Sequence, residues 1–294
     1  MADGSGVIRH TVLRSATKSV TIGPDQPFCI IGERINPTGR PKFQEQLRAG
    51  DLSLVEADVH AQVAGGATML DVNMGVPLTD EAELLAAAIK LVQSLTDLPL
   101  CIDSSVVEAL DAGLAAYDGK ALVNSVTGEK ERLDQILPLV KRYGAAVIAL
   151  PNEEEEIPED PHKRLAITRK IIDIACGTYE IPIEDIVIDP LAMPVGADST
   201  YAKKTMEAIS LIRDEFGVNT TLGAGNVSFG MPGRHALGSS FLPMAMVAGL
   251  TSAIMDARTP QMVEAVRAGD LMLGNDEWGA AWIAAHRAKQ AATA

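Results

Sequence analysis

Residues 98–104 read LPLCIDS, a short run that is apolar on both faces and ends in a carboxylate and a hydroxyl. A strand with one solvated face alternates apolar and polar residues, whereas a parallel strand covered on both sides is apolar throughout. A helical pattern follows at about 106–116. The stretch therefore predicts a buried parallel strand that leads into a helix.

The same unit recurs along the whole chain. Eight such units in 294 residues predict an α/β fold, a single-domain (β/α)8 TIM barrel. An open doubly wound sheet is the alternative, although about six strands are more usual there. The apolar runs are FCIIGERI (28–35), ATMLDVN (67–73), LPLCIDS (98–104), ALVNSV (121–126), AAVIAL (145–150), DIVIDPL (185–191), NTTL (219–222) and SAIMDA (252–257).

Helix signals separate these runs. One helix is predicted to end at Gly65-Gly66, and another to begin after Asp80, with Glu83 three residues later. Residues 1–27 are predicted to be an N-terminal extension, a hairpin that closes the bottom of the barrel. The barrel itself spans 28–274, and 275–294 form a C-terminal helix or tail with Trp278 and Trp282. The other predicted helices lie near 43–65, 80–95, 133–140, 161–176, 200–216, 235–248 and 260–273.

Composition restricts the classes of partner. The net charge is −14, and no basic cluster is longer than two residues, so nucleic acid and anionic membranes are poor partners. The three cysteines are scattered without a CxxC pair, which favours a reduced, cytoplasmic protein without disulfides. No apolar run reaches the ~18 residues of a membrane-spanning helix.

Polar residues stand at the ends of most predicted strands. In a barrel, the carboxyl ends of the strands meet at one mouth, where the chemistry of this fold takes place. Each residue alone is explained equally well as a helix cap or a turn residue. The set, converging from several strands, predicts a site. Its members are Glu33, Asn36, Asp71, Asn73, Asp103, Asn124, Asp189, Gly223, Gly225, Asn226 and Asp256.

The chemistry of this set favours a neutral heteroaromatic ligand with several donors and acceptors. A carboxylate accepts from an amino group and a ring N–H together, and a carboxamide serves either kind of atom. The pair Gly223-x-Gly225 is not a dinucleotide fingerprint, because Ser228 stands at the third glycine position. Asp71, Asp103 and Asp189 have the ligand type for Mg²⁺, but nothing further supports a metal, and we predict that none is bound directly.

Six segments carry a family resemblance. GERINPTGR, LDVNMG, CIDSS, LVNSV, VIDPLAMPVGAD and GAGNVSFGMPGR occur in this order between about Phe28 and Leu273. On these segments the chain resembles the methyltetrahydrofolate:corrinoid-protein methyltransferases and the folate module of cobalamin-dependent methionine synthase. The resemblance implies a pterin-binding TIM barrel that transfers a methyl group between N5 of a tetrahydrofolate and a corrinoid.

The resemblance also implies residue roles. Asp103, Asn124 and Asp189 match the positions that hold the pterin ring, with Gly223 and Gly225 beside them. Asn226 matches the asparagine near the reactive N5 and is the predicted catalytic residue. Glu33, Asn36, Asp71, Asn73, Arg234 and Asp256 are further candidates. Gly225 stands where the family often has serine, a change expected to alter loop stiffness rather than chemistry.

The corrinoid must come from a partner, because the chain carries no DxHxxG-type segment. The chain is expected to be a homodimeric enzyme of one-carbon metabolism, with methionine biosynthesis among its candidate pathways. Three alternatives stay open: a dihydropteroate synthase-like enzyme, a non-catalytic folate-binding subunit, and a Mg²⁺-dependent lyase or aldolase. Dihydropteroate synthases typically carry a lysine and arginine motif late in the chain, and this sequence shows no convincing KxxS-type stretch near the seventh strand. The direction of methyl transfer is not predicted.

Overall fold

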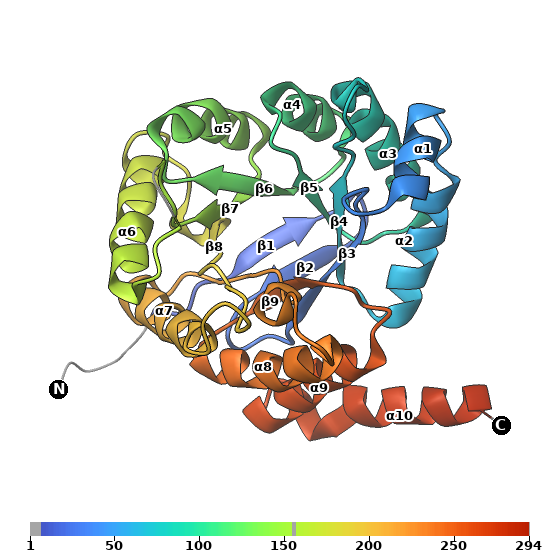
Figure 1. The fold of residues 1–294 in the computed structure, drawn as a ribbon, viewed down its shortest axis with the longest axis vertical. Coiled ribbons are helices and arrows are strands. Elements are labelled where there is room, and N and C mark those ends of the chain that lie inside the picture. The colour runs from blue at the N-terminus through green and yellow to red at the C-terminus, as the bar shows by residue number, and fades with distance from the viewer. Residues whose placement is uncertain (1–6, 155–156, 294) are drawn as a thin grey trace.

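Seven parallel strands form a curved sheet in the order β8-β7-β6-β5-β4-β3-β9. This computed structural model describes residues 7–154 and 157–293. Helices surround the sheet on its outer side (Figure 1). The strands are β3 (Cys29–Ile35), β4 (Met69–Asn73), β5 (Leu100–Asp103), β6 (Leu122–Thr127), β7 (Ala146–Leu150), β8 (Ile186–Ile188) and β9 (Ser252–Met255).

Residues 219–224 close the sheet into a barrel between β8 and β9. Ile188 donates to the Asn219 carbonyl and accepts from Thr221, each at 2.9 Å. On the other side, Ile254 donates to Leu222 and accepts from Ala224, also at 2.9 Å. The segment forms isolated parallel bridges instead of a continuous ladder. The predicted seventh strand therefore occupies its place in the barrel without regular strand geometry, and the predicted (β/α)8 fold is confirmed.

The predicted helices are present, with one difference. The stretch near 43–65 forms two helices, separated around Gly50, whose φ of 72° does not fit a right-handed helix. Gly66 caps the second helix in the left-handed conformation, and Asp80 caps the next by accepting from the Glu83 amide. The helices are α1 (Pro41–Arg48), α2 (Ser53–Gly65), α3 (Glu81–Leu95), α4 (Val107–Ala116), α5 (Lys130–Tyr143), α6 (Pro161–Gly177), α7 (Tyr201–Phe216), α8 (Arg234–Ala248), α9 (Pro260–Leu273) and α10 (Ala280–Thr293).

The two faces of the sheet carry separate cores. Ile30, Leu70 and Ile102 belong to the large cluster between the strands and the helices. Ile31, Met69 and Cys101 belong to a smaller cluster inside the barrel. Because side chains alternate along a strand, the strands are apolar on both faces, as the sequence predicts.

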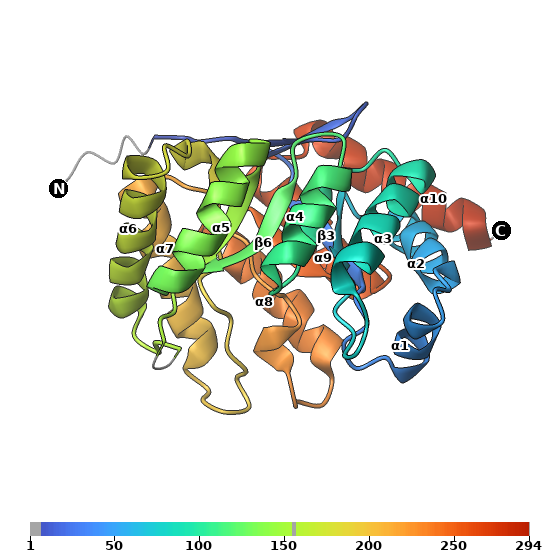
Figure 2. The same ribbon diagram turned by 90° about the horizontal axis from the view of Figure 1, so that it is seen from above.

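A hairpin crosses the amino-terminal end of the barrel. Strands β1 (Thr11–Arg14) and β2 (Ser19–Ile22) pair antiparallel, and Leu13 and Ile22 join the inner cluster. Asn219 fastens the hairpin by donating to the carbonyls of Arg9 and Ile22 at 3.2 and 3.0 Å. In Figure 2 the hairpin lies at one end, and α1 and the loops before α7 and α8 lie at the other. The mouth is thus the open end. The first six residues of the predicted extension lie outside the described residues.

Candidate active site

Side chains alternate between the two faces of each strand, and this alternation also determines which way the predicted site residues point. Met69 and Cys101 point into the barrel, so Asp71, Asn73 and Asp103, which are two or four residues further on, point inward as well. The same count places Glu33, Asn124, Asp189 and Asp256 on the inner face, at or just beyond the carboxyl ends of their strands.

Three adjacent strands present a row of polar side chains. Asn73, Asp103 and Asn124 are register partners across β4, β5 and β6. All three are half-buried, and Asn73 hydrogen-bonds the Asp103 carboxylate. Asp71 lies one layer deeper, only 2% exposed, and accepts from the Asn124 amide nitrogen at 3.2 Å. The row faces the mouth, and Asp71 supports it from below.

Burial perturbs both carboxyl groups of this cluster. Desolvation, opposed by the hydrogen bond from Asn73, raises the pKa of Asp103 to about 6. Desolvation and the neighbouring Asp103 raise the pKa of Asp71 well above its usual range. Perturbed carboxyl groups at a barrel mouth are typical of functional sites.

Asp189 occupies the opposite side of the barrel wall, after β8. Its Oδ1 accepts from the Leu191 amide at 2.8 Å, and desolvation raises its pKa to about 6. Arg164 of α6, which is fully buried, holds this loop by donating to the carbonyls of Pro190 and Leu191 at 2.7 and 2.9 Å. Sequence reasoning missed Arg164, because an arginine on a helix, 26 residues before Pro190 in the chain, carries no local sign of burial.

Asn226 begins a single turn of 3-10 helix and is exposed at the mouth. A Cβ on Gly223 would lie 2.9 Å from the Asn226 amide nitrogen, so the side chain folds back over this glycine. Arg234, also exposed, donates to the Gly225 carbonyl at 2.9 Å. Gly223 therefore makes room for Asn226, and Arg234 fixes the loop next to it.

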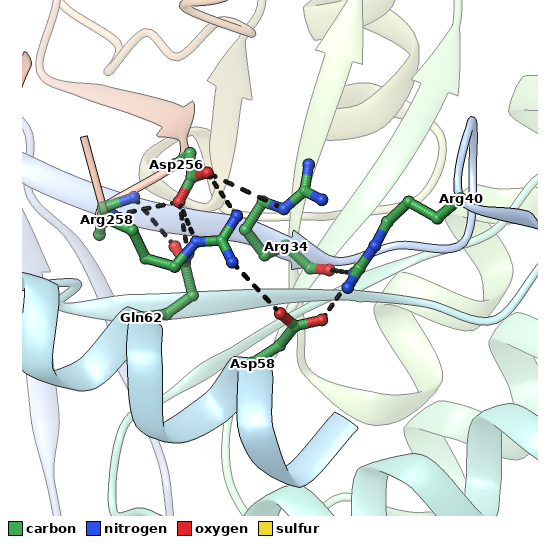
Figure 3. Close-up of polar contacts among 7 residues, drawn as sticks. Arg34, Arg40, Asp58, Gln62, Asp256 and Arg258 are labelled. Carbon is green, nitrogen blue, oxygen red and sulfur yellow. Dashed lines mark hydrogen bonds and ion pairs between the residues drawn. The ribbon is translucent and has the colours of Figure 1, made fainter. Parts of the chain in front are cut away.

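Asp256 is bonded to protein groups through both of its oxygens (Figure 3). Oδ1 accepts from Gln62 at 2.7 Å, and Arg258 donates to Oδ1 and Oδ2 at 2.9 and 2.8 Å. Burial is outweighed by these bonds, and the pKa of Asp256 falls to about 2. Asp58 pairs with Arg258 at 3.7 Å and with Arg40, the N-cap residue of α1, at 2.6 Å. The carboxylate of Asp256 thus joins β9 to α2.

A cavity of about 200 Å³ opens at the rim between β3, the 219–224 segment and β9. Glu33, Arg34, Gly225, Arg234 and Asp256 are among its lining residues. Desolvation and the charge of Asp256 raise the pKa of Glu33. Asn36 lies outside this lining and accepts from the Thr38 amide at 2.9 Å, so it shapes the loop after β3.

Across residues 7–154 and 157–293, no three His, Cys, Asp or Glu side chains are grouped so that they could hold a metal ion. Over the same residues, no helix combines the length and the apolar character needed to span a bilayer. The three cysteines are free, and Cys29 and Cys101 are buried inside the barrel.

The inward carboxylates and carboxamides of the mouth form the kind of site that suits a flat heteroaromatic ligand. The family model described as "Pterin binding enzyme" matches residues 32–256, and the chain belongs to that family. The chain also belongs with the methyltetrahydrofolate:corrinoid methyltransferases. It is 31% identical over 250 residues to methylcorrinoid:tetrahydrofolate methyltransferase of Eubacterium limosum, covering 84% of this chain and 92% of that protein.

A second relative is much longer. The chain is 32% identical over 252 residues to methionine synthase of Mycobacterium tuberculosis, covering 81% of this chain but 21% of that protein. Solved structures agree on the fold. Dihydropteroate synthases from Vibrio fischeri and Xanthomonas albilineans superpose with TM-scores of 0.68 and 0.67, at 17% and 19% identity, over 90% and 89% of this chain and 98% of each of theirs.

Proposed function

We propose that the chain moves a methyl group between N5 of a tetrahydrofolate and the cobalt of a corrinoid carried by a separate protein. The chain is a methyltransferase by its family. We assign roles to residues of this chain from one observation, the inward row of Asn73, Asp103 and Asn124, with Asp71 beneath it. This row offers acceptors and a carboxamide to a flat, donor-rich ring.

Two carboxylates bind the pterin in this proposal. Asp103 accepts from an amino group and the neighbouring ring N–H, which is the pairing a carboxylate makes best. Asp189 uses Oδ1 for the Leu191 amide, and Oδ2 is the oxygen we assign to the ligand. Asn124 donates one amide hydrogen to Asp71, so its carbonyl oxygen is fixed toward the mouth. Asp103, Asn124 and Asp189 together recognise the donor and acceptor groups along the edge of the pterin ring.

Asn226 is the proposed catalytic residue. The methyl group leaves N5 without the electrons of the N–C bond, and the cobalt supplies the pair that forms the new bond. The electrons left on N5 need a proton, which is a general-acid problem. The Asn226 carboxamide oxygen accepts from protonated N5 and stabilises that form, while the exposed loop lets the cobalt approach in line.

The reaction also requires a partner protein at the mouth. A corrinoid protein has to cover the mouth, so the loops after the strands form its docking surface. A homodimer in the cytoplasm is expected, and light scattering of the purified chain would test the dimer.

The decisive experiment mixes the purified chain with 5-methyltetrahydrofolate and reduced cobalamin and follows the absorption spectrum of methylcobalamin. Its appearance at a rate proportional to protein concentration is the expected result. Folate binding without methylcobalamin would favour a non-catalytic folate-binding subunit, and the absence of both would refute the proposal. The Asn226→Ala variant serves as the control for chemistry at the mouth.

A further inference from the structure

A bulge in β3 brings two consecutive side chains to one cavity. The register of β3 against β4 shifts between Gly32 and Ile35, and both Glu33 and Arg34 line the rim cavity of about 200 Å³. In a regular strand, neighbouring residues point to opposite faces, and a bulge redirects one of them. The bulge therefore adds an arginine to a mouth at which the other inward strand residues are mostly carboxylates and carboxamides.

The guanidinium of Arg34 has unused hydrogen-bonding capacity. Among the described residues its Nε, which is buried, has no hydrogen-bond partner, and it forms an ion pair with Asp256 at 3.8 Å. In Figure 3, the dashed line to the Arg34 side chain joins its Nε to Asp256. Asp256 is already satisfied by Arg258 and Gln62. Arg34 is thus held in place but left open to another acceptor.

Arg234 supplies a second cation to the same cavity. It stands in the first turn of α8, a helix of 15 residues, where the dipole also favours an anion. Its Nη2 bond to Gly225 and its position over the Phe229 ring, 5.5 Å from the centroid, restrict its side chain. The guanidinium retains further donors.

The carboxylates in the cavity do not cancel this charge. Asp256 is paired with Arg258, and Glu33 lies within the Coulomb influence of Arg34, Arg234 and Arg258 together. Asp58 and Arg40 complete the network around Arg258, so four guanidinium groups face three carboxylates, and burial disfavours the charge of Glu33. In a chain of net charge −14, this is a local positive site.

We propose that Arg34 and Arg234 form a carboxylate subsite that binds the glutamyl tail of the folate. The inference rests on the proposed function. The pterin-binding row lies on β4–β6, whereas this cavity lies across the mouth at β3 and β9, beside the Asn226 loop. A folate carries its carboxylates at the end of the molecule opposite the pterin ring. A ligand laid across the mouth places them here, where arginine can bind them in bidentate geometry.

Calorimetry with two ligands tests the subsite. One is 5-methyltetrahydrofolate, and the other is its diamide, in which both glutamyl carboxylates are neutral carboxamides of the same size. The wild type is expected to bind the diamide about tenfold more weakly, as the loss of a charged hydrogen bond predicts. Arg34→Gln and Arg234→Gln are each expected to remove most of this difference by weakening the folate alone. Arg169→Gln on the outer helix α6 removes the same charge far from the cavity and should leave the difference intact.

The outcomes separate the subsite from the function. Equal affinity of the wild type for both ligands would overturn the subsite and leave pterin binding standing. An equal loss for both ligands in Arg34→Gln, at unchanged melting temperature, would also overturn it. If the wild type binds neither ligand, the proposed function fails and the subsite fails with it.

Discussion

The amide nitrogen of Asn124 donates to the Asp71 carboxylate at 3.2 Å, reaching past the intervening strand β5. Asn124 faces the mouth, and Asp71 lies buried beneath it. Because the amide nitrogen is engaged below, the carbonyl oxygen is the part of Asn124 that a ligand meets. In the proposed site, Asp71 is therefore a positioning residue that orients Asn124 and does not itself contact the pterin.

This relationship predicts a difference between two variants of Asp71. Asp71→Asn keeps an acceptor for Asn124 and should change pterin affinity less than about threefold, because burial already favours the uncharged form of Asp71. Asp71→Ala frees the Asn124 amide to rotate and should weaken pterin binding by about tenfold. Calorimetry and thermal melting of both variants measure the effects. A similar loss of affinity in both, or none in either, would contradict the positioning role.

A second prediction concerns the glycine beneath Asn226. A methyl group on Gly223 would meet the Asn226 amide nitrogen at 2.9 Å, and this flexible side chain can move away. Gly223→Ala should fold normally and lower kcat by displacing Asn226. Asn226→Ala should lower kcat more strongly at unchanged stability, as expected for a group that acts in the transition state.

The double variant distinguishes this mechanism from a general disturbance of the loop. Residues that act through one another are non-additive. Gly223→Ala should therefore cost little further activity once Asn226 is alanine. Additive losses in kcat would show that Gly223 acts independently of Asn226. Wild-type turnover in Asn226→Ala would show that Asn226 only shapes the turn.

The third prediction is a pH dependence of folate binding. Burial raises the pKa values of Asp103 and Asp189 to about 6, so both carboxyl groups are protonated more readily in the folded protein than at their usual value of 3.8. The ligand needs the ionised forms. Affinity should be constant above about pH 7 and fall as the pH drops through 6, by up to about tenfold per unit for each proton.

The effect on stability has the opposite direction. A raised pKa means that the folded state binds the proton more tightly than the unfolded state, so each group stabilises the fold at low pH and loses that effect between about pH 4 and 6. Asp103→Asn should therefore flatten part of both profiles. Calorimetry and urea unfolding between about pH 4 and 8 would measure them. An unchanged binding profile in Asp103→Asn would exclude Asp103 as the titrating group.

The sequence predicted those features that depend on alternation along single strands. Apolar runs ending in Asp103 or Asn124 imply both the barrel and the inward direction of these side chains, because period-two geometry fixes both. Features that depend on contacts between distant segments were not predictable. The bulge that redirects Arg34 and the bonds that engage both oxygens of Asp256 arise from neighbours that only the closed barrel brings together.

The loop after β8 illustrates the same limit and gives the last prediction. Arg164, with no exposed surface, donates to the carbonyls of Pro158, Pro190 and Leu191 at 2.7, 2.7 and 2.9 Å. Arg164→Met would leave these buried carbonyls without their donor and is expected to cost about 3 kcal/mol in the free energy of unfolding. Urea unfolding measures this directly.

Arg169→Met provides the matched control, because Arg169 lies on the same helix and its partner Glu215 is near the surface. Surface ion pairs contribute little, so its cost should stay below about 1 kcal/mol. Arg164→Met should also weaken pterin binding, since the carbonyls it holds flank the loop that aims Asp189. Retention of full pterin affinity by a folded Arg164→Met protein would separate the loop's stability from its role in the site.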